Sequence, residues 1–289
     1  MVNMPEYGQL KKDNLERIFI FFAYFVLIFW AVLMIIPMIW MYLSAFTPEH
    51  LLIDIPPKIS IKYFTTSNFK MMFDLAPETW RWYWNTLYLC VVITLLSIFF
   101  NALAGYCFAK LRFPGKKVLF WTIIATMIVP THTIVIPLFV MVSNVFRLFD
   151  THWAIILPQL SAPVGIFLMK QYMQSLPSDL EDAARIDGCS EPGIFFRIVL
   201  PLCKPIISVW AIFVFIANWK NFFWPLVVLN TPAKFVIEVG LATLQQQYST
   251  RYGIVMAGAA LASIPMIIVF FIFQKELTKG LALGSAIKG

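Results

Sequence analysis

Six long apolar stretches divide the chain, and they limit what it can fold into more than any other feature. The first stretch, residues 18–46, contains no charged residue. A helix needs about 20 consecutive apolar residues to cross the hydrocarbon core of a bilayer, and a run of this length meets that need. The other five stretches are residues 85–109, 118–146, 153–169, 205–228 and 253–274. The pattern predicts an all-α integral membrane protein with six transmembrane helices.

Prolines occur inside several of these stretches. Pro130 and Pro137 lie in the third stretch, and Pro158 and Pro163 lie in the fourth, which is the shortest. Proline is tolerated in membrane helices where neighbouring helices or waters satisfy the freed carbonyl groups. We therefore expect each stretch to cross the membrane despite its prolines.

The composition agrees with a membrane protein. Hydrophobic residues make up 60% of the 289 residues and charged residues only 13%, whereas a soluble domain has about 25% charged residues. The net charge of +7 comes from basic residues spread between the apolar stretches rather than gathered in one patch. This distribution argues against nucleic-acid binding and favours a membrane-topology explanation.

The basic residues are unevenly divided between the loops. With the N-terminus inside, fourteen of the 22 Lys and Arg residues fall on the inner side and seven on the outer side. The positive-inside rule then places the N-terminal segment 1–17, the loop 177–204 and the C-terminal tail 276–289 in the cytosol, around a membrane domain of residues 18–275. No cleavage site follows the first apolar run, which we interpret as a retained anchor. We expect a multi-pass protein of the cytoplasmic (inner) membrane with both termini cytoplasmic.

The outer side carries one long loop of about 38 residues, which lies between the first two membrane-length stretches. Pro56-Pro57 and the polar run 65–68 predict that it is mostly irregular with short helices. Trp80, Trp82, Tyr83 and Trp84 precede the second span, and we expect them to form an outer interfacial belt.

The inner loop at residues 177–204 contains helix-start and helix-stop signals. Ser178 followed by Glu181 predicts a capping box, in which each side chain bonds the backbone amide of the other. Acidic residues crowd the first turn, where the helix dipole favours them. Gly188 is placed to end the helix in a left-handed conformation.

A second short helix is predicted directly after this turn. Ser190 is positioned to cap it, with Pro192 in its first turn. An apolar stripe then runs along Ile194, Phe195, Ile198 and Val199. Helix, glycine turn and helix close to the membrane suit a docking element for another protein, while an ordinary interfacial hairpin is the alternative.

The same loop resembles a known family. Asp182-Ala183-Ala184, then Gly188, then Leu200-Pro201 are similar to the EAA signature of permease subunits in binding-protein-dependent ABC importers. In that family the loop forms coupling helices seated in a groove of the ATPase subunit. The signature glutamate is Asp182 here, which keeps the charge with a shorter reach. The ATPase-coupling residues that the resemblance implies are Glu181, Asp182, Ala183, Ala184, Asp187, Gly188, Leu200 and Pro201.

The resemblance extends along nearly the whole chain and is closest to carbohydrate importers, such as the second permease of the maltose and glycerol-phosphate systems. The supporting stretches are residues 84–87, 104–113, 150–154, 157–158 and 274–289. It implies a partner set of a homologous second permease, two ATP-binding cassette subunits, an extracytoplasmic solute-binding protein and membrane lipid. ATP and Mg²⁺ would act in the ATPase subunits, so this chain is expected to bind no cofactor and to be no enzyme. The family also implies that the tail reaches the ATPases and that residues 230–252 approach the binding protein.

Lys220 is the only charged residue within the apolar stretches. Charges in spans are costly and usually face a cavity or a partner. Two interpretations are open: Lys220 lines the translocation path and favours an acidic sugar, or it snorkels outward or pairs with an acid of the partner permease. Asn218 and Asn221 share a helix face at this point. His132 either faces the path or bonds a carbonyl that a proline has freed.

Other classes of protein fit less well. No Walker A pattern occurs, and the few His, Asp, Glu and Cys residues show no metal or nucleophile spacing. A secondary transporter, the main alternative, needs paired ionisable groups near the membrane midplane, and no carboxylate lies clearly inside a span. A channel would leave the docking loop unexplained. The sequence therefore favours the permease of an ABC importer for a sugar, an oligosaccharide or an acidic sugar derivative.

Overall fold

The computed structural model describes residues 6–59, 61–247 and 251–286, with side chains described for most of residues 16–274. In this part of the chain every regular element is helical. The chain forms two compact units. The first comprises Met1–Asp74 and Tyr248–Ala260, and the second comprises Leu75–Gln247 and Leu261–Gly289.

Three helices are long and apolar enough to cross a membrane within the described residues. They are α1 (Glu6–Ala45), α4 (Thr79–Lys110) and α15 (Tyr252–Ala286), with candidate spans at Phe19–Ala45, Thr79–Lys110 and Tyr252–Gln274. Three bent pairs bring the number of candidate spans up to six. The all-helical membrane fold is therefore as expected from the sequence.

The bent pairs show that some candidate spans are not single continuous helices. The third predicted span is broken by 97° between Lys116–Ile128 and Thr131–Val145. Pro130 lies at this break, where its missing N–H and its ring prevent a regular helix. Trp153–Gln159 and Pro163–Gln174 meet at 41°, and Glu191–Leu202 and Lys204–Trp219 meet at 77°.

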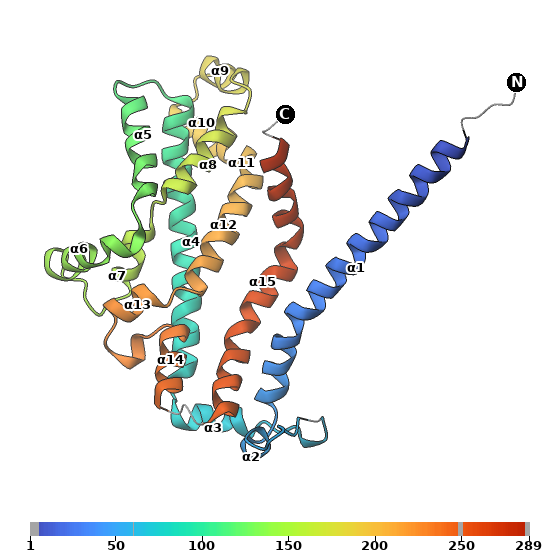
Figure 1. Cartoon of the computed structure of the whole chain (residues 1–289). Helices are drawn as coiled ribbons and strands as arrows, with labels where there is room; N and C mark the ends of the chain where they lie inside the picture. Colours follow the sequence, from blue (N-terminus) through green and yellow to red (C-terminus); the bar gives the residue numbers. More distant parts are fainter. Residues whose placement is uncertain (1–5, 60, 248–250, 287–289) are drawn as a thin grey trace, which may run out of the picture. The chain divides into compact units, whose positions relative to one another are not determined.

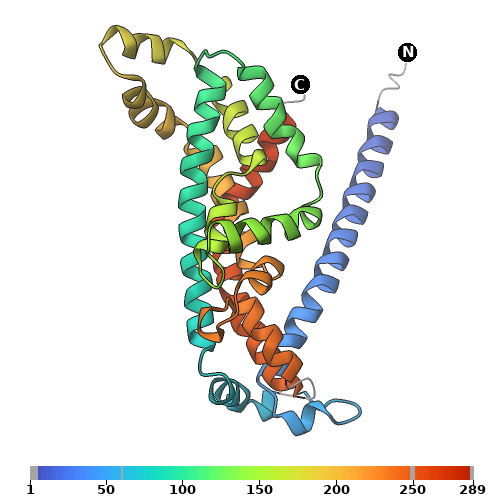
Figure 2. The same cartoon turned by 90° about the vertical axis from the view of Figure 1, so that its left-hand side faces the viewer.

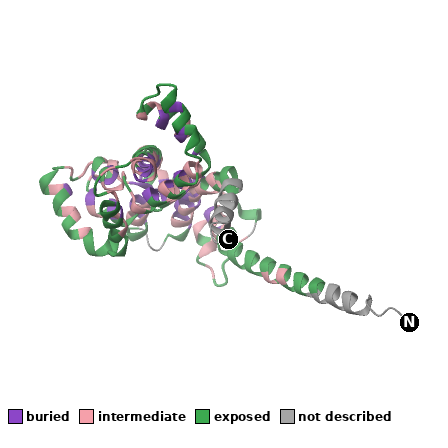
Figure 3. Ribbon diagram, turned by 90° about the horizontal axis from the view of Figure 1, so that it is seen from above, coloured by how far each residue is buried: buried purple, intermediate pink, exposed green. Residues whose placement is uncertain are grey.

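The first unit contains α1, α2 (Glu49–Leu52), a 3-10 turn (Ile61–Tyr63), α3 (Ser67–Leu75) and the first turns of α15. The outer loop is thus mostly irregular with short helices, as predicted. Asn68 is buried, and its amide donates to Ala45 O at 3.0 Å and Thr47 O at 2.8 Å. These bonds satisfy carbonyl groups at the end of α1. The side chains along most of α1 are exposed, and this helix is green over most of its coloured length in Figure 3.

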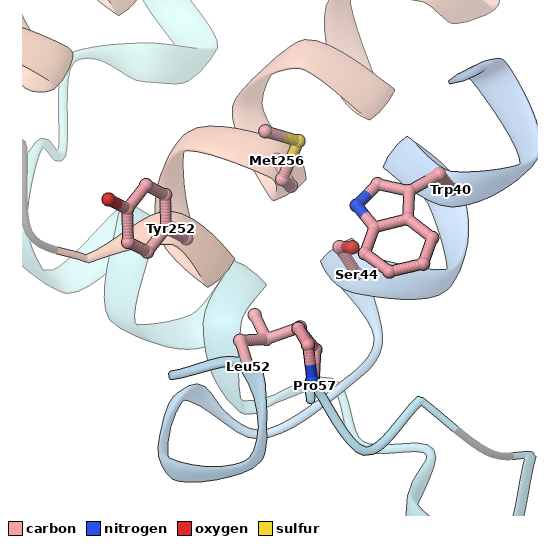
Figure 4. Close-up of a pocket in the computed structure, with 6 residues that line it drawn as sticks. All are labelled: Trp40, Ser44, Leu52, Pro57, Tyr252 and Met256. Atoms are coloured by element: carbon pink, nitrogen blue, oxygen red, sulfur yellow. The ribbon is translucent and has the colours of Figure 1, made fainter. Parts of the chain in front are cut away.

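A pocket of about 190 Å³ lies within the first unit. Figure 4 shows Trp40 and Ser44 of α1 on one side and Tyr252 and Met256 of α15 on the other, with Leu52 and Pro57 from the outer loop. Glu49 fixes the start of α15 beside it, because its carboxylate accepts from the amides of Tyr252 at 2.8 Å and Gly253 at 2.7 Å. The residues predicted to line the translocation path are absent from this pocket.

The second unit is built around α4, which packs against α8 (Pro163–Gln174) and α12 (Lys204–Trp219) (Figure 1). Gly105 allows α4 to approach α8 closely, because a Cβ atom there would lie 2.5 Å from the Cβ of Met169. Asn101 is fully buried, and its side-chain oxygen accepts from the amide of Ala162 at 3.1 Å, just before α8 begins.

The remaining elements of the second unit are short. They are α5 (Lys116–Ala125), turns at Thr126–Ile128 and Thr131–Ile134, α6 (Val135–Val140), a π-helix (Met141–Val145), α7 (Trp153–Ile156), a turn at Leu157–Gln159, α9 (Asp179–Ile186), α10 (Glu191–Ile194), a π-helix (Phe195–Val199), α11 (Leu200–Leu202), α13 (Phe223–Val228), a turn at Pro232–Lys234 and α14 (Ile237–Gln247).

Residues 228–237 are held tightly at the end of α4 where that helix begins. Trp82 donates to Pro232 O at 2.7 Å, and the Thr86 hydroxyl accepts from the Ile237 amide at 2.8 Å. Trp82 is therefore buried in the protein and does not belong to an interfacial belt, in contrast to the prediction. Trp80 and Trp84 remain about half exposed.

Candidate coupling site and translocation path

The predicted docking loop forms α9, a turn at Gly188, and a second helical segment that runs from α10 through α11. Figures 1 and 2 show α9 and α10 at the end of α4 that carries Lys110, and α14 at the opposite end. The helix–glycine–helix prediction is thus confirmed in its elements.

Gly188 ends α9 in the predicted left-handed conformation, with φ of +80°. The amide of Gly188 donates to Arg185 O at 3.1 Å, and that of Cys189 donates to Ala184 O at 2.9 Å. These bonds satisfy carbonyls of the last turn of α9. A Cβ atom at Gly188 would meet no other atom within 4 Å, so only backbone conformation requires glycine here.

The prediction of a capping box at the start of α9 was wrong. Ser178 precedes the helix but makes no side-chain capping bond, and Glu181 does not reach back to it. Instead Glu181 pairs with Lys110 of α4 at 2.7 Å, with the two side chains only 4% and 10% exposed. Lys110 also donates to Leu176 O at 2.9 Å. Tertiary pairing with a buried cation has taken the place of the local cap.

Arg185 joins the two helices of the loop. Its guanidinium donates to Asp182 at 2.8 Å and to Glu191 at 2.8 Å. The bonds that Arg185 donates to Glu191, and then those to Asp182, raise the pKa of Arg185 above its usual range. Glu191 also accepts a bond of 2.7 Å from the hydroxyl of Tyr106 on α4. Both helices of the loop are therefore tied to the same end of α4.

The second helical segment is packed into the core of its unit. Ile194, Phe195 and Val199 are buried, and Ile198 is half-buried against them. The ring of Phe195 lies 5.2 Å from that of Tyr106. Since the predicted apolar stripe packs against protein, the alternative of an interfacial hairpin lying in the membrane surface does not describe this segment.

The outward face of α9 is left uncovered in the described chain. Ala183 and Asp187 are exposed, and Ile186 is 87% exposed. Among the residues predicted for coupling, Glu181 and Ala184 face inward, Asp182, Gly188 and Pro201 are exposed, and Leu200 is half-buried. The loop thus presents a small, mixed apolar and acidic surface on a helix anchored from behind by charge pairs.

The predicted path residues lie around a break in the fifth span. α12 ends at Trp219, and Lys220 occupies the position directly after the helix. The prediction that Asn218 and Asn221 share one helix face was therefore wrong, because the chain leaves the helix between them. The Asn221 amide donates to Asn218 O at 3.1 Å in a turn, and α13 begins at Phe223.

The side chains of Asn218 and His132 differ in their burial and hydrogen bonding. Asn218 is buried, its amide donates to Val214 O at 2.9 Å, and its side-chain oxygen has no hydrogen-bond partner among the described atoms. His132 is exposed, with its ring centroid 5.4 Å from that of Phe223. One of the two interpretations required a hydrogen bond from His132 to a carbonyl freed by a proline. Among the described residues His132 makes no such bond.

Lys220 is exposed and forms no ion pair within the described part of the chain. Half-buried Glu238 of α14 is the acid near it. Burial raises the pKa of the Glu238 carboxyl, and the charge of Lys220 opposes that rise. Glu238 belongs to the same chain, so it does not test the interpretation that Lys220 pairs with an acid of the partner permease.

Sequence reasoning missed a second cluster, centred on Asp150 in the segment before α7. Its carboxylate accepts from the amides of Asn230 and Thr231 at 2.9 and 3.0 Å and from Lys234 at 2.8 Å. These bonds, led by that from Lys234, hold the pKa of the carboxyl well below its usual range against the opposing effect of burial. The signal was present in the stretch 150–154, which carried the family resemblance without a structural role.

Comparisons with known proteins agree with this arrangement. Residues 101–282 match the family described as binding-protein-dependent transport system inner membrane component. The chain is 39% identical over 225 residues to the arabinooligosaccharides transport system permease protein AraQ of Halalkalibacterium halodurans, covering 78% of this chain and 80% of that protein. It is 32% identical to the galactooligosaccharides transport system permease protein GanQ of Bacillus subtilis, covering 91% of this chain and 94% of that protein.

A solved structure shares the fold. The crystal structure of a bacterial ABC transporter involved in the import of the acidic polysaccharide alginate contains a chain that superposes with a TM-score of 0.80 at 24% identity, covering 90% of this chain and 96% of that one. The family match spans more than half of the chain, and the AraQ relative passes 30% identity over more than two thirds of it. The chain therefore belongs to the binding-protein-dependent transport system inner membrane components, as a multi-pass permease subunit of an ABC importer.

Proposed function

We propose that this permease carries an oligosaccharide or a sugar derivative, together with a homologous second permease. Relatives at 39% and 32% identity are named for the transport of arabinooligosaccharides and galactooligosaccharides. Two ATPase subunits and an extracytoplasmic solute-binding protein complete the importer, and ATP and Mg²⁺ act in the ATPases. The secondary-transporter alternative loses its support, because the family depends on a binding protein.

The observation that carries the proposal is the mounting of α9. Its outward face is not covered by any described residue, whereas its inward face is joined to α4 by the buried Lys110–Glu181 pair and, through Arg185 and Glu191, by the Tyr106 hydroxyl. A force applied to the outward face by closing ATPases would pass to α4 without bending a flexible loop. This mounting suits α9 to act as the coupling helix.

Helix α4 would carry this displacement to the other end of the second unit. At its first turns, Trp82 and Thr86 of α4 hold the backbone of Pro232 and Ile237. That segment follows α13, which begins just after the break at Lys220. A displacement of α4 would therefore reach the residues around the break, where we place one wall of the translocation path.

The topology that goes with this mechanism puts both termini and the α9 loop in the cytosol. The excess of Lys and Arg on that side supports it. Residues 230–252 then lie on the outer side, within reach of a binding protein. The side chains of the tail 276–289, proposed to reach the ATPases, lie outside the described residues.

Two turn glycines give a matched test of coupling. Gly188 and Gly115 have φ of +80° and +78°, and a Cβ atom at either would meet nothing within 4 Å. Alanine at either position therefore carries a similar conformational cost of about 1–2 kcal/mol. We expect Gly188→Ala to reduce uptake per ATP hydrolysed in reconstituted importer, while Gly115→Ala keeps that ratio. Equal ratios in the two variants would contradict a coupling role for the α9 turn.

A pull-down separates the importer from the alternative class. The chain purified from its native membrane should bring down ATP-binding cassette subunits, and uptake should require ATP. Transport by the purified chain alone, with no ATPase retained, would contradict the proposal.

A further inference from the structure

A cluster of cations in the second unit has no role in the mechanism above. Arg112 follows the end of α4, Lys116 and Lys117 begin α5, and Lys170 lies near the end of α8. The cluster thus brings together three helix ends beside the α9 loop, and we call it the basic cluster.

Contacts within the second unit hold two of these cations in place. The Lys116 ammonium donates to Leu111 O at 2.8 Å, just past the end of α4. The Lys170 ammonium lies 4.1 Å from the ring centroid of Phe120 on α5. Both lysines are half-buried, and the charges of Lys170 and Arg112 both act on Lys116.

The basic cluster has no counter-charge within the described part of the chain. None of its four residues forms an ion pair there, whereas Lys110, Arg185 and Lys234 each have a carboxylate within 3 Å. The neighbouring acid Glu181 is already taken by Lys110. Like charges held together in a partly buried place repel one another, and an anion from outside the chain would relieve that repulsion.

The surroundings indicate the kind of anion. Directly after the cations, α5 exposes Val118, Leu119 and Trp121 to between 52% and 72%. These apolar side chains belong to a candidate membrane span. A ligand that meets both groups carries a negative headgroup at the membrane surface and hydrocarbon below it. Basic pockets between membrane helices on the cytoplasmic side are suited to anionic lipid headgroups.

We propose that the basic cluster binds the phosphate of an anionic phospholipid, with the acyl chains lying along the exposed face of α5. The proposal rests on the topology given under the proposed function, which puts this end of α4 at the inner membrane surface. Free phosphate shares the headgroup chemistry but would make no contact with the exposed apolar face of α5. The bound lipid would join the ends of α4, α5 and α8 next to the Lys110–Glu181 pair.

The test counts lipid retained by the assembled importer. The importer is reconstituted in vesicles of equal parts phosphatidylcholine and phosphatidylglycerol, extracted in mild detergent, and weighed by native mass spectrometry. The variant R112Q/K170Q should retain on the order of tenfold less phosphatidylglycerol, given the usual contribution of a basic residue near an anionic surface. The control R197Q/K204Q removes two exposed cations of the same unit that lie outside the cluster, and should retain as much as the unchanged protein.

Each outcome decides the proposal. Equal retention in the two double variants would overturn it. Binding of radiolabelled inorganic phosphate in lipid-free detergent that is lost in R112Q/K170Q, with no phosphatidylglycerol retained by the unchanged importer, would assign the cluster to a soluble anion and overturn the lipid. If the double variant does not assemble, K170Q should retain less lipid than K170R. Retention is measured apart from ATP-driven uptake, so lost uptake with normal retention counts against the proposed function and not against this site.

Discussion

Two lysines of the second unit stand at corresponding points of two neighbouring helices and differ in their surroundings. Lys110 ends α4, is 10% exposed and pairs with buried Glu181 at 2.7 Å. Lys220 follows the end of α12, is exposed and has no ion pair in the described residues. Lys234 falls between them, since it is half exposed and pairs with Asp150 at 2.8 Å.

The difference separates a charge used for structure from a charge left for another role. A buried cation must be paired to be tolerated, and removing its partner leaves a desolvated charge. An exposed cation gives little stability, so it can be kept for a ligand. We therefore expect the effect of substitution on stability to decrease from Lys110 to Lys234 to Lys220. The effect on substrate choice should increase in that same order.

The largest effect on stability is expected at the buried pair. Lys110→Met leaves Glu181 buried with only Arg185 nearby at 3.8 Å. Breaking a buried pair costs about 3–5 kcal/mol, and we expect a clear fall in the thermal unfolding temperature of the purified permease and a loss of ATP-coupled uptake.

The matched rescue is the double variant Lys110→Met with Glu181→Leu, which removes both charges. Replacing a buried pair by apolar residues is often neutral, so stability should largely return. Coupling should return with it if the pair acts only as an anchor. A double variant as unstable as the single one would show that the pair is not the source of the cost.

The intermediate effect is expected at Asp150. Asp150→Asn keeps the shape but removes the charge that Lys234 and two backbone amides share. Hydrogen bonds to a charged group contribute about 1.5–3 kcal/mol, and because the pair is part-exposed we expect the lower end. Thermal unfolding should show the loss, with Lys58→Gln, at an exposed i,i+4 pair with Asp54, as the control that changes little.

The same site gives a pH prediction. The pKa of Asp150 is lower in the folded protein than in the unfolded chain. Its contribution is therefore fully present above the unfolded pKa of about 4 and is lost as pH falls below it. The difference in unfolding temperature between the unchanged protein and Asp150→Asn should be constant from neutral pH down to about pH 5 and shrink at lower pH. A difference that grows as pH falls would contradict the assigned charge state.

The sequence predicts those features of the fold and site that depend on neighbouring residues. Apolar stretches of membrane length give the helices, and Gly188 ends α9 because only local backbone conformation decides it. The partner of Glu181 was missed because a capping box with Ser178 is local, while Lys110 lies on another helix. The bond from Tyr106 to Glu191 spans 85 residues, and no periodicity reveals such a contact.

The break after Trp219 was missed for a related reason. Residues 205–228 are apolar almost throughout, so hydropathy gives one span, and no proline lies between Pro205 at its start and Pro225. The chain leaves the helix at Lys220 instead, where Trp219 donates to Ala262 O at 3.0 Å and Tyr83 packs on its ring at 5.6 Å. Tertiary contacts of this kind decide where a membrane helix stops, and they are not visible in the local sequence.

The smallest effect on stability and the most selective effect on transport are expected at Lys220. Lys220→Asn removes an exposed charge that has no ion pair among the described residues, so the free energy of unfolding should change by less than about 0.5 kcal/mol. If Lys220 faces the path, uptake of uronate-bearing oligosaccharides should fall by up to about tenfold relative to neutral ones. Loss of Lys220 also removes the charge that opposes the raised pKa of Glu238, so any pH dependence of uptake that follows Glu238 should move to higher pH. Lys220→Arg keeps the charge and should keep the preference. Equal changes in uptake of charged and neutral sugars would leave Lys220 as the neighbour of Glu238, and would remove the distinction between a structural and a ligand-facing lysine on which the comparison rests.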